Sequence, residues 1–149
     1  MYQNDFKFSQ MKFKKSLGQN LLIDKNILRK IVSVTSLNKK NVLEIGSGTG
    51  NLSNEILKCN PKKLICIEKD KNFSINLKEK FKAKKNFTII NEDILKINLK
   101  RILLKDMIIV GNLPYNISSQ ILIKFIRVYP WPPKFSKLIL MFQDRKSVV

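Results

Sequence analysis

The sequence lacks a long hydrophobic run, because none of its apolar stretches approaches the roughly 20 residues that a membrane-spanning helix needs. No secretory signal pattern opens the chain. Cysteine is also scarce, and the spacing of Cys59 and Cys66 does not fit a metal site. We therefore predict a cytoplasmic protein without membrane or metal, in which both cysteines are buried, reduced thiols.

Acidic residues and arginine are few. The sequence has 11 acidic residues against 29 basic ones, which gives a net charge of +18 at pH 7. The arginines are Arg29, Arg101, Arg127 and Arg145. An excess of positive charge is typical of proteins that bind nucleic acid. Codon bias of an AT-rich genome toward lysine is the competing explanation, and the scarcity of acids favours nucleic acid.

A glycine-rich loop follows an apolar, β-prone run at Val42–Ile45. Gly46, Gly48 and Gly50 stand at every second position, and a helical pattern begins directly after them. This order lets a nucleotide-like ligand approach bare backbone, which a Cβ would block. A dinucleotide site would have the spacing G-x-G-x-x-G. Here Glu44 precedes the loop, and the pattern E-x-G-x-G-x-G is that of class I S-adenosyl-L-methionine (SAM) methyltransferases.

Two acidic residues follow later apolar runs. Glu68 ends the strand predicted at 63–68, about twenty residues beyond the loop, where an acid accepts hydrogen bonds from ribose hydroxyls. Asp93 follows the strand predicted at 87–91 and suits the exocyclic amine of the cofactor's adenine. A surface acid at a strand end and a turn-forming aspartate are the structural alternatives.

Helical and extended patterns alternate along the chain, and at 149 residues it is sized for one domain. Asp24 is suited to cap a first helix. Further helices are predicted at 51–59, 72–81 and 118–128, with a short turn at 99–104. Strands are predicted at 42–45, 63–68, 87–91, 106–110 and 138–142. Such alternation implies right-handed crossovers, and we predict an α/β, Rossmann-like, mostly parallel sheet truncated after strand five.

The segment after the fourth strand, Asn112-Leu113-Pro114-Tyr115, is the most specific signal. Adenine N6 is a poor nucleophile because its lone pair is conjugated into the ring. The Asn112 side-chain oxygen and the Pro114 carbonyl would hold its two hydrogens and favour the pyramidal geometry that attack requires. Tyr115 would stack on an extruded base, which is worth about 1–3 kcal/mol. A plain turn is the structural alternative.

Together these segments resemble the ribosomal RNA adenine N6-dimethyltransferases. The resemblance rests on Glu68 and on the stretches Lys15–Leu22, Glu44–Gly50, Glu92–Ile94 and Gly111–Ser118. The last stretch is closer to the housekeeping small-subunit enzymes than to the macrolide-resistance enzymes. The resemblance implies SAM as the donor and four methyl transfers onto two adjacent adenosines near the 3′ end of 16S rRNA, within the immature small ribosomal subunit.

The resemblance also implies site residues. Cofactor contacts are implied at Asn20, Leu22, Gly46, Glu68, Asp93 and Asn112, and Gln19, Glu44, Gly48 and Gly50 join them from the same motifs. The catalytic residues would be Asn112, Pro114 and Tyr115. Leu21 stands where the family commonly has phenylalanine, a difference that should alter packing rather than chemistry.

The resemblance covers residues 12 to about 143. We expect a flexible arm at 1–11, an incomplete catalytic domain at 12–143 and a non-native terminus at 144–149. Family members continue with two more strands and a helical RNA-binding domain. Without these, we expect the strand at 138–142 to form an exposed apolar edge, and the chain, as a monomer, to bind SAM weakly and to methylate rRNA poorly or not at all.

Two other functions stay open. One is a non-catalytic factor for rRNA binding or ribosome assembly on the same fold, and the intact Asn112–Tyr115 segment favours the enzyme over it. The other is an amino-methyltransferase acting on DNA or protein, since Asn-x-Pro-Tyr recurs there. The Gly18-Gln19-Asn20 segment argues against that alternative.

Overall fold

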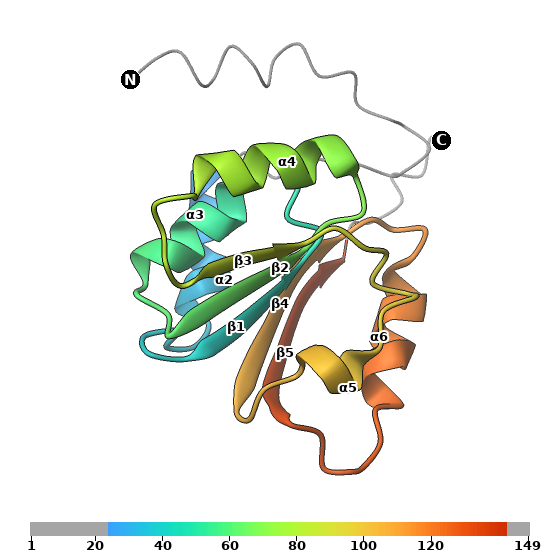
Figure 1. Ribbon diagram of the computed structural model, residues 1–149. Helices are drawn as coiled ribbons and strands as arrows, with labels where there is room; N and C mark the ends of the chain where they lie inside the picture. The colour runs from blue at the N-terminus through green and yellow to red at the C-terminus, as the bar shows by residue number, and fades with distance from the viewer. Residues whose placement is uncertain (1–23, 143–149) are drawn as a thin grey trace, which may run out of the picture.

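The computed structural model describes residues 24–142, whose strands form one parallel sheet in the order β3-β2-β1-β4-β5 (Figure 1). The strands are β1 (Asn41–Ile45), β2 (Lys63–Ile67), β3 (Phe87–Ile90), β4 (Met107–Leu113) and β5 (Phe135–Phe142). Every neighbouring pair is parallel. The predicted α/β, Rossmann-like class is confirmed, whereas the arm at 1–11 and the candidate residues Gln19, Asn20 and Leu22 lie outside the described residues.

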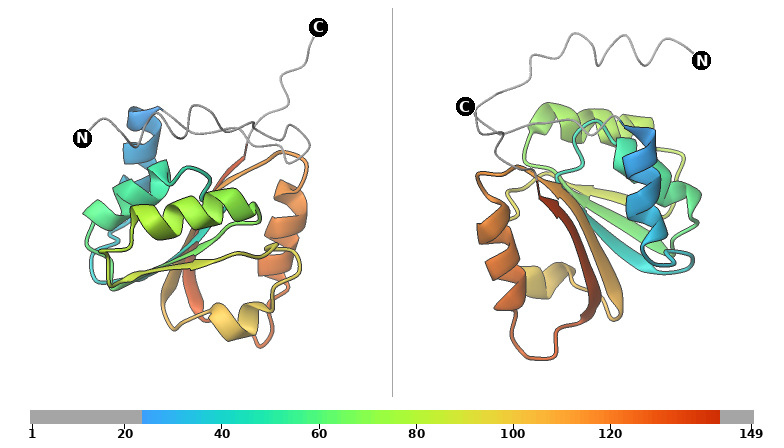
Figure 2. Two further views of the ribbon diagram at one scale, coloured as in Figure 1. Left: turned by 45° about the horizontal axis from the view of Figure 1, so that its top comes forward. Right: turned by 180° about the vertical axis from the view of Figure 1, so that it is seen from behind.

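Helices cover both faces of this sheet. They are α2 (Lys25–Ser33), α3 (Asn51–Lys58), α4 (Lys71–Lys80), α5 (Leu99–Ile102) and α6 (Ser118–Ile126). Apolar side chains of α2 and α3 form one buried cluster with the sheet, and those of α5 and α6 form a second. Figure 2 shows α6 on the opposite side of the sheet from α2 and α3. Because both faces are covered, residues Met107–Val110 of the central strand β4 are all apolar and buried.

Asp24 and Asp70 each cap a helix. The Asp24 carboxylate accepts hydrogen bonds from the amides of Asn26 at 2.8 Å and Ile27 at 3.4 Å, as expected for the start of α2. Asp70 accepts from the amide of Asn72 at 2.8 Å in the same way. The capping geometry at Asp70 starts α4 at Lys71, one residue before the predicted position.

Strand β4 is longer than predicted. It continues through Gly111, Asn112 and Leu113, which were expected to form a loop, because these residues pair with residues 140–142 of β5. The partner strand likewise begins at Phe135 instead of Leu138. Local sequence predicted a turn at this position, but pairing between distant segments supplies the backbone groups with hydrogen-bond partners and extends both strands.

Strand β5 is the last strand of the described sheet on this side. Its residues 138–141 are half-buried, since alternate side chains pack into the two core clusters, and Phe142 is exposed. The expected exposed apolar edge is therefore found at Phe142 but not along the whole strand. Between residues 24 and 142, no helix combines the length and apolar character needed to cross a membrane.

The buried contacts between α3 and the sheet should dominate stability. Ile56 is completely buried, so Ile56→Ala removes packed methyl groups and should lower the free energy of unfolding by about 2–5 kcal/mol. Ile75 on α4 is 56% exposed, and Ile75→Ala should change the free energy of unfolding by less than about 0.5 kcal/mol. Urea denaturation followed by circular dichroism measures both values, and equal effects would contradict the described core.

Candidate active site

Three candidate residues lie side by side at the carboxyl end of the sheet. The last residue of β1, Ile45, pairs with the last residue of β2 and with Gly111 of β4. The residues that follow, Gly46, Glu68 and Asn112, therefore form one row across three neighbouring strands. A Cβ built on Gly46 would lie 3.8 Å from the backbone oxygen of Asn112. The glycine loop and the Asn-Leu-Pro-Tyr segment are thus brought together, as a transfer between them requires.

The loop after β1 adopts a conformation that favours glycine. Gly46, Gly48 and Gly50 have φ angles of 70°, 53° and 82°, in the left-handed region. At Gly50 space is also restricted, because an added Cβ would come within 2.5 Å of the Leu77 side chain and 3.1 Å of the Phe81 ring on α4. The alternating glycines are therefore needed both for the turn and for its packing under α4.

Glu68 connects this loop to the end of β2. Its carboxylate is buried and accepts hydrogen bonds from the amides of Gly48 and Asp70, both at 2.8 Å. Burial raises the pKa of Glu68, although these amides oppose the shift. A carboxylate has about four acceptor positions, so these amides leave capacity for a further donor. The position fits the predicted role as an acceptor for ribose hydroxyls.

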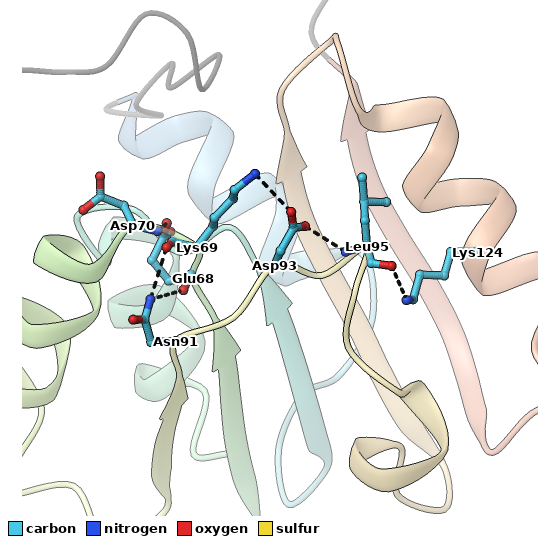
Figure 3. Close-up of polar contacts among 7 residues, drawn as sticks. All are labelled: Glu68, Lys69, Asp70, Asn91, Asp93, Leu95 and Lys124. Carbon is cyan, nitrogen blue, oxygen red and sulfur yellow. Dashed lines mark hydrogen bonds and ion pairs between the residues drawn. The ribbon is translucent and has the colours of Figure 1, made fainter.

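Asn91 and Lys69 stabilise the same edge (Figure 3). The Asn91 side-chain amide donates to the backbone oxygens of Glu68 at 2.8 Å and Lys69 at 3.2 Å. The Lys69 ammonium forms an ion pair with Asp93 at 3.0 Å. Neither Asn91 nor Lys69 was recognised from the sequence, because a single polar residue after a strand carries no signal of its partner.

Asp93 lies in the loop after β3 and has two kinds of partner. One oxygen accepts from the Leu95 amide at 2.9 Å, so Asp93 forms a turn, as the structural alternative predicted. The other pairs with Lys69. Burial alone would raise the pKa of Asp93, but the Leu95 amide and the Lys69 ammonium hold it below its ordinary value. The Leu95 carbonyl in turn accepts from the Lys124 ammonium at 2.8 Å, which fixes the loop against α6.

Asn112 presents an unsatisfied acceptor. Its side-chain oxygen is buried and has no hydrogen-bond partner among the residues that the structure describes. Leaving a buried acceptor unsatisfied costs about 1–3 kcal/mol, and native proteins rarely do so without a functional reason. At this position in the row, the oxygen is suited to accept a hydrogen bond from a bound ligand.

Pro114 and Tyr115 follow Asn112. The Pro114 carbonyl accepts from the amides of Ile117 at 3.3 Å and Ser118 at 3.1 Å, because the chain turns directly into α6. This carbonyl is therefore used at the start of α6 in the described conformation, and its role toward the adenine amine stays a prediction. Tyr115 is 48% exposed, and its role in stacking stays a prediction.

The structure corrects the role of Glu44. Its side chain is 1% exposed and points to the face of the sheet covered by α3, where it accepts hydrogen bonds from Ser53 at 2.5 Å and Cys66 at 3.3 Å. Glu44 therefore holds β1 against α3, next to the glycine loop, and its buried carboxyl group is not at the surface where a cofactor would bind. The physical reason is strand alternation, which places Glu44 beside its register partner Cys66 under Ser53.

Burial raises the pKa values of both acidic groups in this cluster, Glu44 and Cys66. Burial raises the pKa of Glu44 to about 7, even though the hydrogen bonds from Ser53 and Cys66 act against it. Burial also raises the pKa of the Cys66 thiol, which keeps it protonated as a donor. The prediction of a buried thiol holds for Cys66, while Cys59 is half-buried; both are free. Ser53 is a buried residue of α3, and the sequence did not reveal it as the hydrogen-bond partner of Glu44.

Residues 10–147 match the model of the ribosomal RNA adenine dimethylase family. The chain belongs to this family. The family is SAM-dependent, which confirms the predicted cofactor. The described edge fits SAM, since it offers glycine backbone, the Glu68 carboxylate and the unsatisfied Asn112 oxygen in one row.

A named bacterial relative is similar to most of this chain. The ribosomal RNA small subunit methyltransferase A of Pelagibacter ubique is 52% identical over 133 residues, which are 89% of this chain and 50% of the relative. The chain thus spans about half the length of the curated relatives it matches.

Solved structures agree with this membership. A dimethyladenosine transferase from Plasmodium falciparum matches with a TM-score of 0.70 and 32% identity, over 83% of this chain and 43% of that one. The 23S rRNA methyltransferase ErmE matches with a TM-score of 0.69 and 24% identity, over 81% and 48%, which supports the fold.

Substitution of Gly50 should damage the glycine loop. Gly50→Ala forces a left-handed alanine against Leu77, so stability should fall by at least about 1–2 kcal/mol and SAM affinity should decrease. Thr49→Ala, in the same loop at an ordinary φ, serves as the matched control. Urea denaturation and titration calorimetry with SAM would test this, and an unchanged Gly50→Ala protein would contradict the described loop.

Glu44 should make stability depend on pH. The pKa of Glu44 is about 7 in the folded chain against an ordinary value of 4.5, so the folded state holds an extra proton between these pH values. Stability from Glu44 is therefore present at low pH and is lost as the pH rises toward 7, by up to about 3 kcal/mol.

The variant Glu44→Gln carries no titrating proton. We expect the free energy of unfolding of the native chain, relative to this variant, to decrease between pH 4.5 and about 7, the interval bounded by the two pKa values. Urea denaturation at several pH values measures the difference. Parallel pH profiles would show that Glu44 is not protonated in the folded state.

Proposed function

We propose that this chain carries the catalytic site of an enzyme that transfers methyl groups from SAM to the N6 amines of two adjacent adenosines in 16S rRNA, during ribosome biogenesis. The observation that carries the proposal is the buried, unsatisfied oxygen of Asn112, in one row with Gly46 and Glu68. The family match and the small-subunit name of the Pelagibacter ubique relative support the substrate class.

SAM, when bound, supplies an electrophilic methyl group. The residues around it bind and orient it. The glycines at 46, 48 and 50 leave backbone without side chains at the sheet edge, Glu68 accepts from the ribose hydroxyls, and Asp93 accepts from the adenine amine. Two acceptor oxygens at Glu68 and Asp93, on neighbouring strand ends, set the direction in which the cofactor lies along the sheet.

Asn112 is the residue that acts on the methyl acceptor. Its oxygen accepts one hydrogen of the target amine, which holds the nitrogen toward the loop and favours the pyramidal geometry of attack. Because the Pro114 carbonyl is used at the start of α6, Asn112 carries most of this task in the described conformation. Positioning of this kind can supply a large part of the rate enhancement of a displacement reaction.

We also propose that the protein acts as a monomer in the cytoplasm. Every residue of the row comes from one chain, so no second copy is needed to complete it. A reducing compartment is consistent with the free Cys59 and Cys66 thiols. The net charge of +18 supports a long-range attraction to RNA of the immature small subunit.

Substitution of Asn112 tests the proposal. In the full-length product of the gene, Asn112→Ala should lower methyl transfer to immature small subunits by roughly 100-fold, a loss typical of removing one group that acts in the transition state. Asn72→Ala removes an exposed amide on α4 and should leave the rate unchanged. Transfer of radiolabelled methyl groups measures both rates.

Titration calorimetry with SAM separates the possible outcomes. We expect Asn112→Ala to reduce SAM affinity far less than it reduces the rate. Absence of SAM binding by the native protein would reject the cofactor. SAM binding without any transfer would favour a non-catalytic assembly factor, and preferred transfer to DNA or protein would favour the other amino-methyltransferases.

A further inference from the structure

Two large aromatic side chains are exposed at the end of the sheet opposite the cofactor edge. Tyr129 is 73% exposed and Trp131 is 70% exposed, in the connection between α6 and β5. Figures 1 and 2 show this connection beside α5, away from the carboxyl ends of β1 and β2. Isolated exposed aromatics are common, but two such rings this close along the chain indicate a contact surface.

Basic residues gather at the same end of the sheet. The Lys100 ammonium of α5 lies 5.6 Å from the centroid of the Tyr129 ring, as in a cation–π contact. Met107 pairs with Phe135, which brings the residues just before β4 and β5 to the same end of the sheet. We define the aromatic–basic end by its exposed members, which are Lys100, Arg101, Lys105, Arg127, Tyr129, Trp131 and Lys134.

Almost no acid balances this charge. From residue 94 to residue 142 the only acidic residue is Asp106. The basic residues in the same interval are Lys96, Lys100, Arg101, Lys105, Lys124, Arg127, Lys134 and Lys137. An end that is basic and nearly free of carboxylates attracts a polyanion and repels basic protein surfaces. Lysines and arginines of this kind bind phosphates of a nucleic-acid backbone.

Prolines restrict the segment that carries the rings. Pro130, Pro132 and Pro133 alternate with and follow the aromatic residues, and each fixes its own φ angle. A restricted segment loses less conformational entropy when it binds a ligand. Exposed aromatic faces beside cations are the combination that proteins use to bind unpaired nucleotides, with bases stacked on rings and phosphates on cations.

We propose that the aromatic–basic end is a second RNA-binding surface, where unpaired bases stack on Trp131 and Tyr129 while the surrounding lysines and arginines contact phosphates. The seven residues of β4 separate it from the cofactor edge by about 20 Å. The surface therefore does not hold the methyl acceptor, and it orients a distant part of the same RNA. The inference rests on the proposed function only for the choice of RNA as ligand.

Trp131 is the single tryptophan of the chain, so its fluorescence reports directly on this surface. Titration with a short single-stranded RNA should quench the emission because bases stack on the indole, and added salt should weaken the binding. Saturating SAM, at the other end of the sheet, should not quench it. The absence of quenching by RNA would overturn the proposal.

Matched variants localise the binding. Tyr129→Ala and Lys100→Glu should each weaken RNA binding by about fivefold or more, and so should Trp131→Ala, measured by anisotropy of labelled RNA. Lys85→Glu makes the same charge change at an exposed position before β3 and should have less than about a twofold effect. Equal weakening by Lys85→Glu and Lys100→Glu would show that only net charge matters.

Other outcomes also decide the question. Quenching by anionic phospholipid vesicles but not by RNA would assign the surface to a membrane and reject the proposal. SAM calorimetry on the same variants separates this inference from the proposed function. If the native protein does not bind SAM but its fluorescence is quenched by RNA, the methyltransferase is rejected and the surface is retained. If the native protein binds SAM but RNA does not quench it, the surface is rejected and the cofactor is retained.

Discussion

The hydrogen bond from the Gly48 amide to the Glu68 carboxylate is the contact on which the site depends. It joins the loop after β1 to the end of β2. The second oxygen of Glu68 accepts from the amide of Asp70, the residue that caps α4. A buried carboxylate is costly unless it is hydrogen-bonded, so the two amides offset the burial that raises its pKa. The loop therefore has one preferred position over the sheet, and a ligand would meet acceptors that are already oriented.

A second buried acid stabilises the loop from the other side. Glu44 lies on the α3 face of β1, and burial outweighs its hydrogen bonds, so that its pKa rises to about 7. One of its two donors comes from α3, which follows the glycines, and the other comes from β2, which pairs with β1. The two carboxyl groups thus have different partners. Glu68 binds the glycine loop at the carboxyl end of the sheet, and Glu44 connects β1 to α3 on one face of the sheet.

The proposed methyl-transfer site and the proposed RNA-binding surface lie at opposite ends of one strand, β4. The carboxyl end of β4 carries Asn112, with its unsatisfied oxygen, and the amino end lies beside the exposed Tyr129 and Trp131. A rigid parallel sheet holds these two ends at a fixed distance. The two proposals together require an RNA segment longer than one nucleotide, which is long enough to contact both ends.

The sequence alone determined the parallel α/β fold, the glycine loop, the cap at Asp24 and the positions of Glu68 and Asn112. These depend on local chemistry: φ preferences, apolar runs, caps and the order of strands. Only the tertiary structure decided that β4 continues through Asn112, that Glu44 faces Ser53 and Cys66, and that the Pro114 carbonyl is used by α6. Each of these depends on which distant backbone or side chain arrives opposite, and pairing between remote segments leaves no signal in the residues themselves.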